Sequence, residues 1–258
     1  MRLLLICLLS LLLAACAGGG GDPGARTAAS AQPTTSKAQA RAKSHTDLGL
    51  AYLDAGQMVT ALDEARIALA SDSSYAPAYN LLGLVYGELR ETREATQSFE
   101  RALQLAPGDP EISNNYGWFL CQNKEPQKAM GYFQAAIRNP LYSAPAVALT
   151  NAAACAQSMN DEKGAEEYLI RALRYDPGSA RALYMLADNN YRQGRYNEAR
   201  LRMADLLSRA DATPAALWLS IRIARHLGER IEEARYSTQL RRFPNSPEYL
   251  KLTQGQSE

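Results

Sequence analysis

Apolar residues recur along residues 42–243 at spacings of three and four, which is the period of an amphipathic α-helix. The same windows are rich in Ala, Leu, Arg, Glu and Gln, which are strong helix formers. No window keeps the alternation of apolar and polar residues that a half-buried β-strand shows. The pattern therefore predicts an all-α fold of about twelve antiparallel helices, with a further short helix over residues 246–252.

The helical pattern itself repeats at a nearly constant interval. One small residue marks the repeat: Ala61, Ala95, Ala129, Ala165, Ala199 and Ala234. A period of about 34 residues is typical of solenoid proteins, in which each unit is one helix pair that packs on its neighbours. The sequence therefore predicts six helix–turn–helix units over residues 42–243.

The clearest unit spans residues 76–109 and combines small, large and proline residues at fixed positions. These residues are Tyr79, Leu82, Gly83, Tyr86, Ala95, Phe99, Ala102 and Pro107. The combination resembles the tetratricopeptide repeat (TPR). The resemblance implies a right-handed superhelix whose first helices line a concave groove. Because Gly83 and Ala95 are small, we expect them to let the two helices of the unit approach closely.

The last unit departs from this pattern. Arg222 stands where the other units have a small residue, and Arg241 stands where alanine is usual. Terminal units of a solenoid need a more polar outer surface than internal ones. We therefore interpret the last unit as a cap on the array.

The first sixteen residues have the pattern of an export signal. Arg2 precedes an apolar run from Leu3 to Ala15, which is too short to span a membrane but suits a secretory signal peptide. The segment Leu13-Ala14-Ala15-Cys16 resembles the lipobox of bacterial lipoproteins. This resemblance implies that Cys16 is acylated and becomes the first mature residue, and that Ala17 after it favours the outer membrane. The alternative is a plain signal peptide with an incidental cysteine.

Residues 17–41 contain four consecutive glycines, small polar residues and two prolines, with almost no large apolar side chain. Such a segment cannot offset its ordering entropy by burial, so we expect a flexible tether. The predicted organisation is therefore a signal peptide (1–15), lipidated Cys16 with the tether (16–41), six TPR units (42–243) and a C-terminal cap and tail (244–258).

The charge balance and the missing motifs exclude several functions. The chain has 28 basic and 27 acidic side chains, so it offers no basic surface for nucleic acid. Its two histidines, His45 and His226, are far apart in sequence and predict no metal site. No nucleophile elbow, phosphate loop or zinc-protease motif is present. We expect neither an enzyme nor a protein that binds a cofactor or small-molecule substrate.

Cys121 and Cys155 remain after Cys7 leaves with the signal peptide and Cys16 is acylated. They stand one repeat apart, on the first helices of the third and fourth units. Adjacent helices of a repeat array lie close enough for a disulfide, which an oxidising periplasm would preserve. The alternative is a pair of buried free thiols in positions that require small side chains.

The candidate binding residues occupy the predicted groove. They are Leu50, Leu53, Asn80, Leu84, Asn114 and Trp118. Such an apolar stripe, flanked by two amides, suits an extended or helical peptide, because amides can pair with its backbone while the stripe buries its side chains. The alternative is that the stripe only packs the first helices together. We interpret Arg181, Arg192 and Arg195 as a solvated face.

Two C-terminal segments resemble one particular family of TPR proteins. Residues 218–228 and the stretch Leu-Arg-Arg-Phe-Pro-Asn-Ser-Pro-Glu at 240–248 resemble the end of the PilF/PilW family of type IV pilus biogenesis lipoproteins. The resemblance implies a pilotin on the periplasmic face of the outer membrane of a Gram-negative bacterium. Its partner would be the type IV pilus secretin. Two alternatives are another envelope TPR lipoprotein, which assists outer-membrane-protein assembly, and a recruiting subunit of a cell-wall hydrolase.

Overall fold

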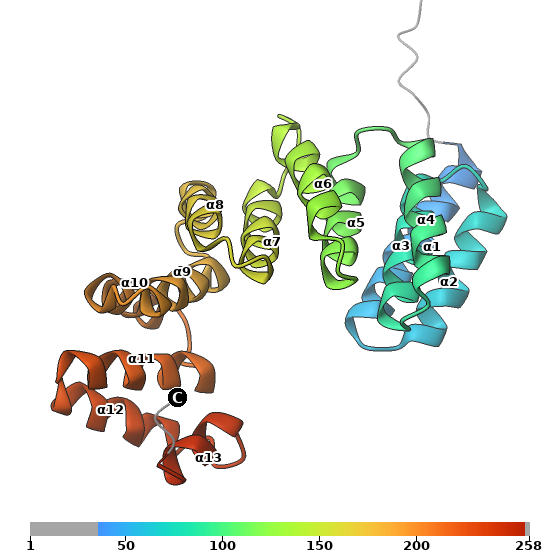
Figure 1. Ribbon diagram of the computed structural model, residues 1–258. Coiled ribbons are helices and arrows are strands. Elements are labelled where there is room, and N and C mark those ends of the chain that lie inside the picture. Colours follow the sequence, from blue (N-terminus) through green and yellow to red (C-terminus); the bar gives the residue numbers. More distant parts are fainter. Residues whose placement is uncertain (1–35, 256–258) are drawn as a thin grey trace, which may run out of the picture. The chain divides into compact units, whose positions relative to one another are not determined.

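The computed structural model describes residues 36–255. In this part of the chain there are thirteen helices and no strand (Figure 1). The helices are α1 (Lys37–Asp54), α2 (Met58–Ser71), α3 (Ala76–Glu88), α4 (Thr92–Leu105), α5 (Pro110–Gln122), α6 (Pro126–Arg138), α7 (Pro145–Ser158), α8 (Glu162–Tyr175), α9 (Ala180–Arg192), α10 (Tyr196–Arg209), α11 (Pro214–Leu227), α12 (Arg230–Leu240) and α13 (Pro247–Thr253). The predicted signal peptide, Cys16 and the tether as far as residue 35 lie outside the described residues.

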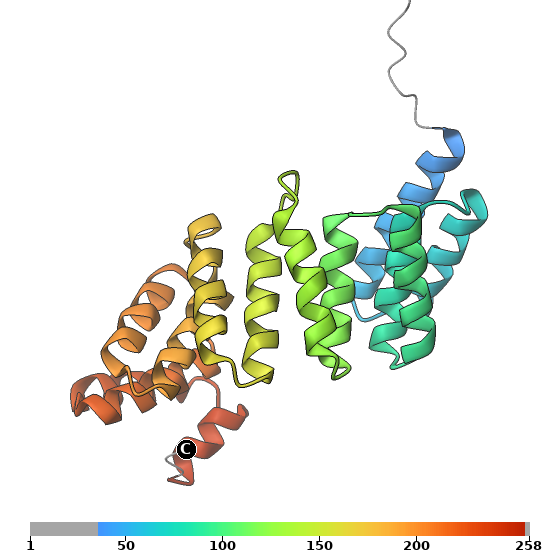
Figure 2. The ribbon, with the colours of Figure 1, turned by 45° about the horizontal axis from the view of Figure 1, so that its top comes forward.

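Consecutive helices pack in pairs, from α1 with α2 to α11 with α12. The first helix of each pair also contacts the first helix of the next pair, so that α1, α3, α5, α7, α9 and α11 form a row (Figure 2). These contacts confirm the prediction of an all-α fold with six helix pairs. None of the helices within residues 36–255 is both long enough and apolar enough to cross a bilayer.

The first helix begins earlier than the sequence predicts. The predicted tether extends to residue 41, whereas α1 starts at Lys37. Ser36 is its N-cap, and Ser36 Oγ accepts a hydrogen bond from the Gln39 amide at 3.0 Å. The cap satisfies one free amide of the first turn, and the following Ala-rich segment has high helix propensity. The assignment of residues 37–41 to a flexible tether is therefore wrong.

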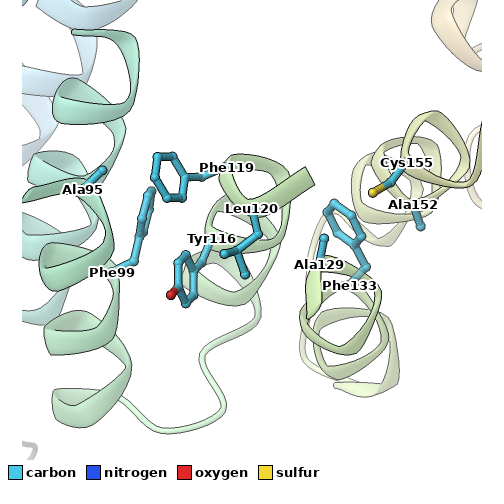
Figure 3. Close-up of a cluster of buried hydrophobic side chains, with 9 residues drawn as sticks. All are labelled: Ala95, Phe99, Tyr116, Phe119, Leu120, Ala129, Phe133, Ala152 and Cys155. Atoms are coloured by element: carbon cyan, nitrogen blue, oxygen red, sulfur yellow. The ribbon is translucent and has the colours of Figure 1, made fainter. Parts of the chain in front are cut away.

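The close approach of paired helices follows from small residues opposite buried rings. A Cβ atom added to Gly83 would lie 2.8 Å from ring carbons of Phe99, and one added to Gly117 would lie 3.0 Å from Phe133. Both rings are fully buried, in the cluster that Figure 3 shows across α4 to α7. This packing confirms the spacing role that the sequence predicts for Gly83.

The alanine repeat holds for five pairs and fails in the sixth. Ala199 and its four earlier counterparts are fully buried, whereas Ala234 is exposed. Its assignment to the repeat is therefore wrong by one residue. Glu233 takes the place of the alanine and accepts a hydrogen bond from Arg225 Nε at 2.6 Å, so an ion pair joins α11 and α12. The same shift of one residue applies to the second alanine of each repeat, which is Ala102 in the clearest unit. In the last pair this position is occupied by the fully buried Leu240 and not by Arg241.

The final helix, α13, covers the exposed side of the last pair. Leu217, Trp218 and Ile221 of α11 form a buried cluster with Leu240, and Tyr249 of α13 packs against it. Ser246 caps α13, because its Oγ accepts the Tyr249 amide at 3.1 Å. The short helix predicted near the C-terminus is therefore present, and it shields apolar surface that a next repeat would otherwise cover.

Candidate functional site

The predicted binding residues lie on the first helices, mainly on α3 and α5. Leu84 follows Asn80 by one helical turn on α3, and Trp118 follows Asn114 by one turn on α5. Residues four apart share one face of a helix, so each helix presents an amide beside a large apolar side chain. We define the first-helix face as the surface formed by Leu50, Leu53, Asn80, Leu84, Asn114, Asn115, Trp118, Asn151 and Arg181.

The apolar members of this face are half-buried. Leu84 and Trp118 pack against the buried cluster around Phe119, and Leu50 and Leu53 pack against the cluster shared by α2 and α3. Each side chain therefore contributes to packing between helices and still presents part of its surface to solvent. The structure places the predicted apolar stripe on one row of helices, in contact with the core below it.

The amides form a chain of hydrogen bonds that the repeat pattern does not reveal. Between α3 and α5, Asn115 Nδ2 donates to Asn80 Oδ1 at 3.3 Å. Within α5, Asn114 Nδ2 donates to Asn115 Oδ1 at 3.3 Å. Between α5 and α7, Asn151 Nδ2 donates to Asn114 Oδ1 at 3.0 Å, and Arg181 Nη1 on α9 donates to Asn151 Oδ1 at 3.0 Å. This amide chain joins four successive first helices.

Arg181 also contacts the tryptophan of the face. Its Cζ lies 5.4 Å from the centroid of the Trp118 ring, within the range of a cation–π interaction. The side chain reaches from α9 past α7, where the small Ala154 occupies the position equivalent to Trp118. Arg181 is exposed, as the interpretation of a solvated face predicts, and an amide and an aromatic ring also contact its guanidinium group.

The other two arginines of the predicted solvated face are in ion pairs. Arg192 lies 2.8 Å from Glu162 and 3.1 Å from Asp188, and Arg195 lies 2.6 Å from Glu166. These side chains are partly exposed, so solvent screens the pairs and each contributes little to stability. The pairs nevertheless orient α8 and α9, and they leave neither arginine as an unpaired charge.

A disulfide joins α5 and α7 beside the amide chain. The Sγ atoms of Cys121 and Cys155 are 2.15 Å apart, and their Cα atoms are 5.8 Å apart. The same two helices are joined by the Asn114–Asn151 hydrogen bond. The covalent link and the hydrogen bond together fix the spacing of the two helices at the middle of the first-helix face.

Burial changes the pKa of three tyrosines in the described residues. Burial raises the pKa of Tyr184, and it raises the pKa of Tyr142 to about 12. Burial also raises the pKa of Tyr116, which lies near the carboxylate of Glu100. A phenolate loses hydration when it is buried, so all three tyrosines remain neutral at physiological pH. The Tyr116 hydroxyl donates a hydrogen bond to Glu100 Oε1 at 3.4 Å, and Tyr184 packs against a buried cluster formed by α9, α10 and α11.

The two histidines have structural contacts. His45 Nδ1 lies 2.6 Å from Glu64, and His226 Nε2 lies 3.0 Å from the Tyr191 hydroxyl while its ring stacks on Tyr196. Across residues 36–255, no three His, Cys, Asp or Glu side chains gather closely enough to hold a metal ion.

The repeat pattern misses Asn115, Asn151 and Arg181 for a specific reason. Asn151 does not stand at the repeat position equivalent to Asn114. Two residues are inserted between the third and fourth pairs, and Asn151 lies one residue after the position that would then correspond to Asn114. A comparison of one position per unit passes over such a residue. A search for amides at two adjacent positions of each first helix would have found the row.

Comparisons with known proteins agree with the geometry. Residues 80–143 and 156–220 match tetratricopeptide-repeat families. The type IV pilus assembly protein PilF of Pseudomonas aeruginosa is 30% identical over 207 residues, which cover 80% of this chain and 82% of PilF. The crystal structure of PilW, a widely conserved type IV pilus biogenesis factor, has a TM-score of 0.75 and 30% identity over 82% of this chain and 98% of PilW. The structure of P. aeruginosa PilF has a TM-score of 0.75 and 27% identity over 85% of this chain and 100% of that one.

Proposed function

Because this chain belongs to the PilF/PilW family of type IV pilus biogenesis proteins, we propose that it is a pilotin. In this role it is an outer-membrane lipoprotein that binds the type IV pilus secretin. It thereby supports the localisation, multimerisation or stability of the secretin. The TPR array is a scaffold for protein interaction, and the secretin is the partner that we propose for it.

The observation that carries this proposal is the first-helix face within a chain that resembles PilF over four-fifths of its length. Three first helices present a connected row of amides, which Arg181 extends to a fourth, and Leu84 and Trp118 lie on the same helices as Asn80 and Asn114. Such a surface can hold a polypeptide by pairing with polar groups and by burying apolar side chains. Shielding a secretin segment in this way would prevent its aggregation before the ring assembles.

The lipid anchor is the second part of the proposal. An acylated Cys16 would fix the protein to the membrane, because each buried CH₂ of an acyl chain contributes about 0.8 kcal/mol. The folded repeats would then carry the bound secretin subunit to the membrane in which the ring forms. In this mechanism the protein binds and delivers its partner, without a chemical reaction.

Deleting the gene tests the proposal. We expect secretin multimers and twitching motility to be lost while monomeric secretin persists. Immunoblots of intact samples measure the multimers, and immunoblots of samples in which the multimers have been dissociated measure the total secretin. A wild-type copy should restore the multimers. A Cys16→Ser copy should restore fewer of them, because the protein would leave the outer-membrane fraction. Unchanged multimers in the deletion strain would rule out the pilotin role.

A further inference from the structure

We propose that the end of the array formed by α1 and α2 lies against an anionic phospholipid surface. We define the N-terminal face as the surface formed by Lys37, Ala38, Arg41 and Leu48 of α1 with Ile67, Ala70 and Ser71 of α2. This contact is additional to the proposed lipid anchor and to the proposed secretin site. The side chains of the folded array supply it, so it does not depend on acylation of Cys16.

The first argument is the distribution of charge along the chain. Residues 23–46 contain four basic residues and no acidic one. Residues 47–258 contain 23 basic and 26 acidic residues. The segment that follows the predicted anchor is therefore positive, whereas the remainder of the chain is slightly negative as a whole. Basic segments next to a membrane anchor are attracted to anionic headgroups.

Two of the four cations have no counter-ion within the folded array. Lys37 and Arg41 are exposed, and neither side chain takes part in a hydrogen bond or ion pair within residues 36–255. Two carboxylates at this end of the pair have partners of their own. Asp47 pairs with Lys43, and Asp72 accepts hydrogen bonds from the loop that follows it. Lys37 and Arg41 are therefore available to an external anion.

The face is also apolar, which favours a lipid over a wholly polar anion. Ile67 and Ala70 line the same surface cavity as Lys37 and Arg41. Ile67 is 40% exposed, and Leu48, which follows Arg41 by two helical turns, is 43% exposed. A phospholipid carries a negative phosphate next to apolar acyl chains. Basic side chains beside apolar ones match both parts, as they do in helices that lie at a membrane interface.

No other part of the described chain covers the N-terminal face. Within residues 36–255, α1 and α2 contact only each other and α3. At the opposite end of the array, α13 packs on α11 and α12 and shields the apolar cluster around Trp218 (Figure 1). The end pair of a solenoid needs a polar surface or a cover. The first pair exposes apolar side chains and has no capping helix, and a membrane surface would supply the cover.

The proposed anchor would make even a weak contact effective. Twenty residues separate Cys16 from Ser36, so a fully extended chain keeps the face within about 70 Å of the membrane. Holding two surfaces so close raises their effective concentration. An acyl anchor together with a basic patch binds a membrane more stably than either alone. The contact would also orient the array, which a single tether does not.

Binding of the unacylated mature chain to vesicles tests the inference. The chain carries Cys16→Ser, so that an acyl group does not contribute, and flotation measures its binding. The vesicles are phosphatidylcholine alone, or equal parts of phosphatidylcholine and phosphatidylglycerol. We expect at least about tenfold stronger binding to the anionic vesicles at low salt, and a decrease as salt is added. Combining Lys37→Glu with Arg41→Glu should weaken that binding at least about tenfold, because each basic side chain contributes about fivefold.

The matched control combines Arg241→Glu with Arg242→Glu. Both arginines are exposed after α12, neither side chain is in an ion pair within the described residues, and the change in net charge is the same. This variant should bind anionic vesicles within about twofold of wild type, because its charges lie far from the contact. Equal binding to the two kinds of vesicle would overturn the inference. Equal losses in the two variants would also overturn it, because net charge alone would then govern binding.

Two further measurements separate the membrane from other occupants of the face. Hydrogen exchange of the acylated protein should be slower in residues 37–43 on anionic vesicles than on phosphatidylcholine vesicles, and equal exchange would contradict the contact. Sedimentation of the protein without lipid should show a monomer. A dimer that Lys37→Glu with Arg41→Glu dissociates would assign the face to a second copy and overturn the inference. Loss of secretin binding with intact vesicle binding would contradict the proposed partner alone.

Discussion

At the scale of single residues, the turn inside each helix pair depends on one left-handed backbone position. These positions are Gly56, Arg90, Lys124, Asn160, Gly194 and Gly228, one in each of the six pairs. Side chains other than glycine crowd the following carbonyl in this region, at a cost of roughly 1 to 2 kcal/mol. The turns at Arg90 and Lys124 are therefore locally strained, and the packing of their helices maintains them.

Relieving one of these turns should stabilise the protein. Arg90 is exposed, with a φ angle of 63°. We expect Arg90→Gly to raise the free energy of unfolding by about 1 kcal/mol, measured by urea denaturation. Gly194→Ala is the opposite change at the equivalent turn, where φ is 73°, and should lower the free energy by a similar amount. A lower stability for Arg90→Gly would contradict this account of the turns.

At the scale of the helix pair, stability depends on how closely two helices approach. Gly83 lies against the buried ring of Phe99, whereas an added Cβ at Gly131 on α6 would meet no atom within 4 Å. Both glycines are helical, so Ala should gain about 1 kcal/mol of helix propensity at either site. Only at Gly83 does overpacking, which costs about 1 to 3 kcal/mol, oppose that gain.

The two alanine variants should therefore differ in sign. We expect Gly131→Ala to raise the free energy of unfolding by up to about 1 kcal/mol. We expect Gly83→Ala to lower it by about 1 kcal/mol, because the added Cβ would lie 2.8 Å from the fully buried Phe99 ring. Urea denaturation of both variants measures the difference. Equal stability of the two variants would show that Gly83 does not set the spacing of α3 and α4.

The disulfide acts at the same scale, because it joins two helix pairs. Cys121 and Cys155 have a sequence separation of 34. Closing a loop of that length lowers the entropy of the unfolded chain, which stabilises the fold by about 3 to 4 kcal/mol. We expect dithiothreitol to lower the urea midpoint of the wild-type protein. The double variant Cys121→Ala, Cys155→Ala should unfold at a lower midpoint that dithiothreitol does not change. A wild-type midpoint that is insensitive to the reductant would contradict a stabilising link.

At the scale of the whole molecule, the repeat was predictable because its causes are local. Apolar spacing defines each helix, and a small residue such as Gly83 or Ala95 permits each pair. The amide chain was not predictable in the same way, because it depends on the register between helices of different pairs. Two residues inserted before α7 shift Asn151 relative to Asn114, and only the packed structure shows that their amides meet.

The errors at the two ends have a related cause. The internal pairs are constrained on both sides, so one regular spacing describes them. The last pair has no following repeat, and there Glu233 and Arg225 form an ion pair where the earlier pairs bury an alanine. At the other end, the cap at Ser36 starts α1 before the repeat pattern begins. Local capping and end effects therefore limit what the repeat period alone can predict.

The central claim is that the first-helix face is the surface that captures the secretin. The most direct measurement is the dissociation constant of the purified secretin for the mature chain and for its Leu84→Glu variant. We expect at least a roughly tenfold weaker affinity for Leu84→Glu, because a buried carboxylate would replace an apolar contact. Val59→Glu makes a similar change at a side chain that is 73% exposed on α2, and it should bind like wild type. Wild-type affinity of a fully helical Leu84→Glu protein would contradict the account.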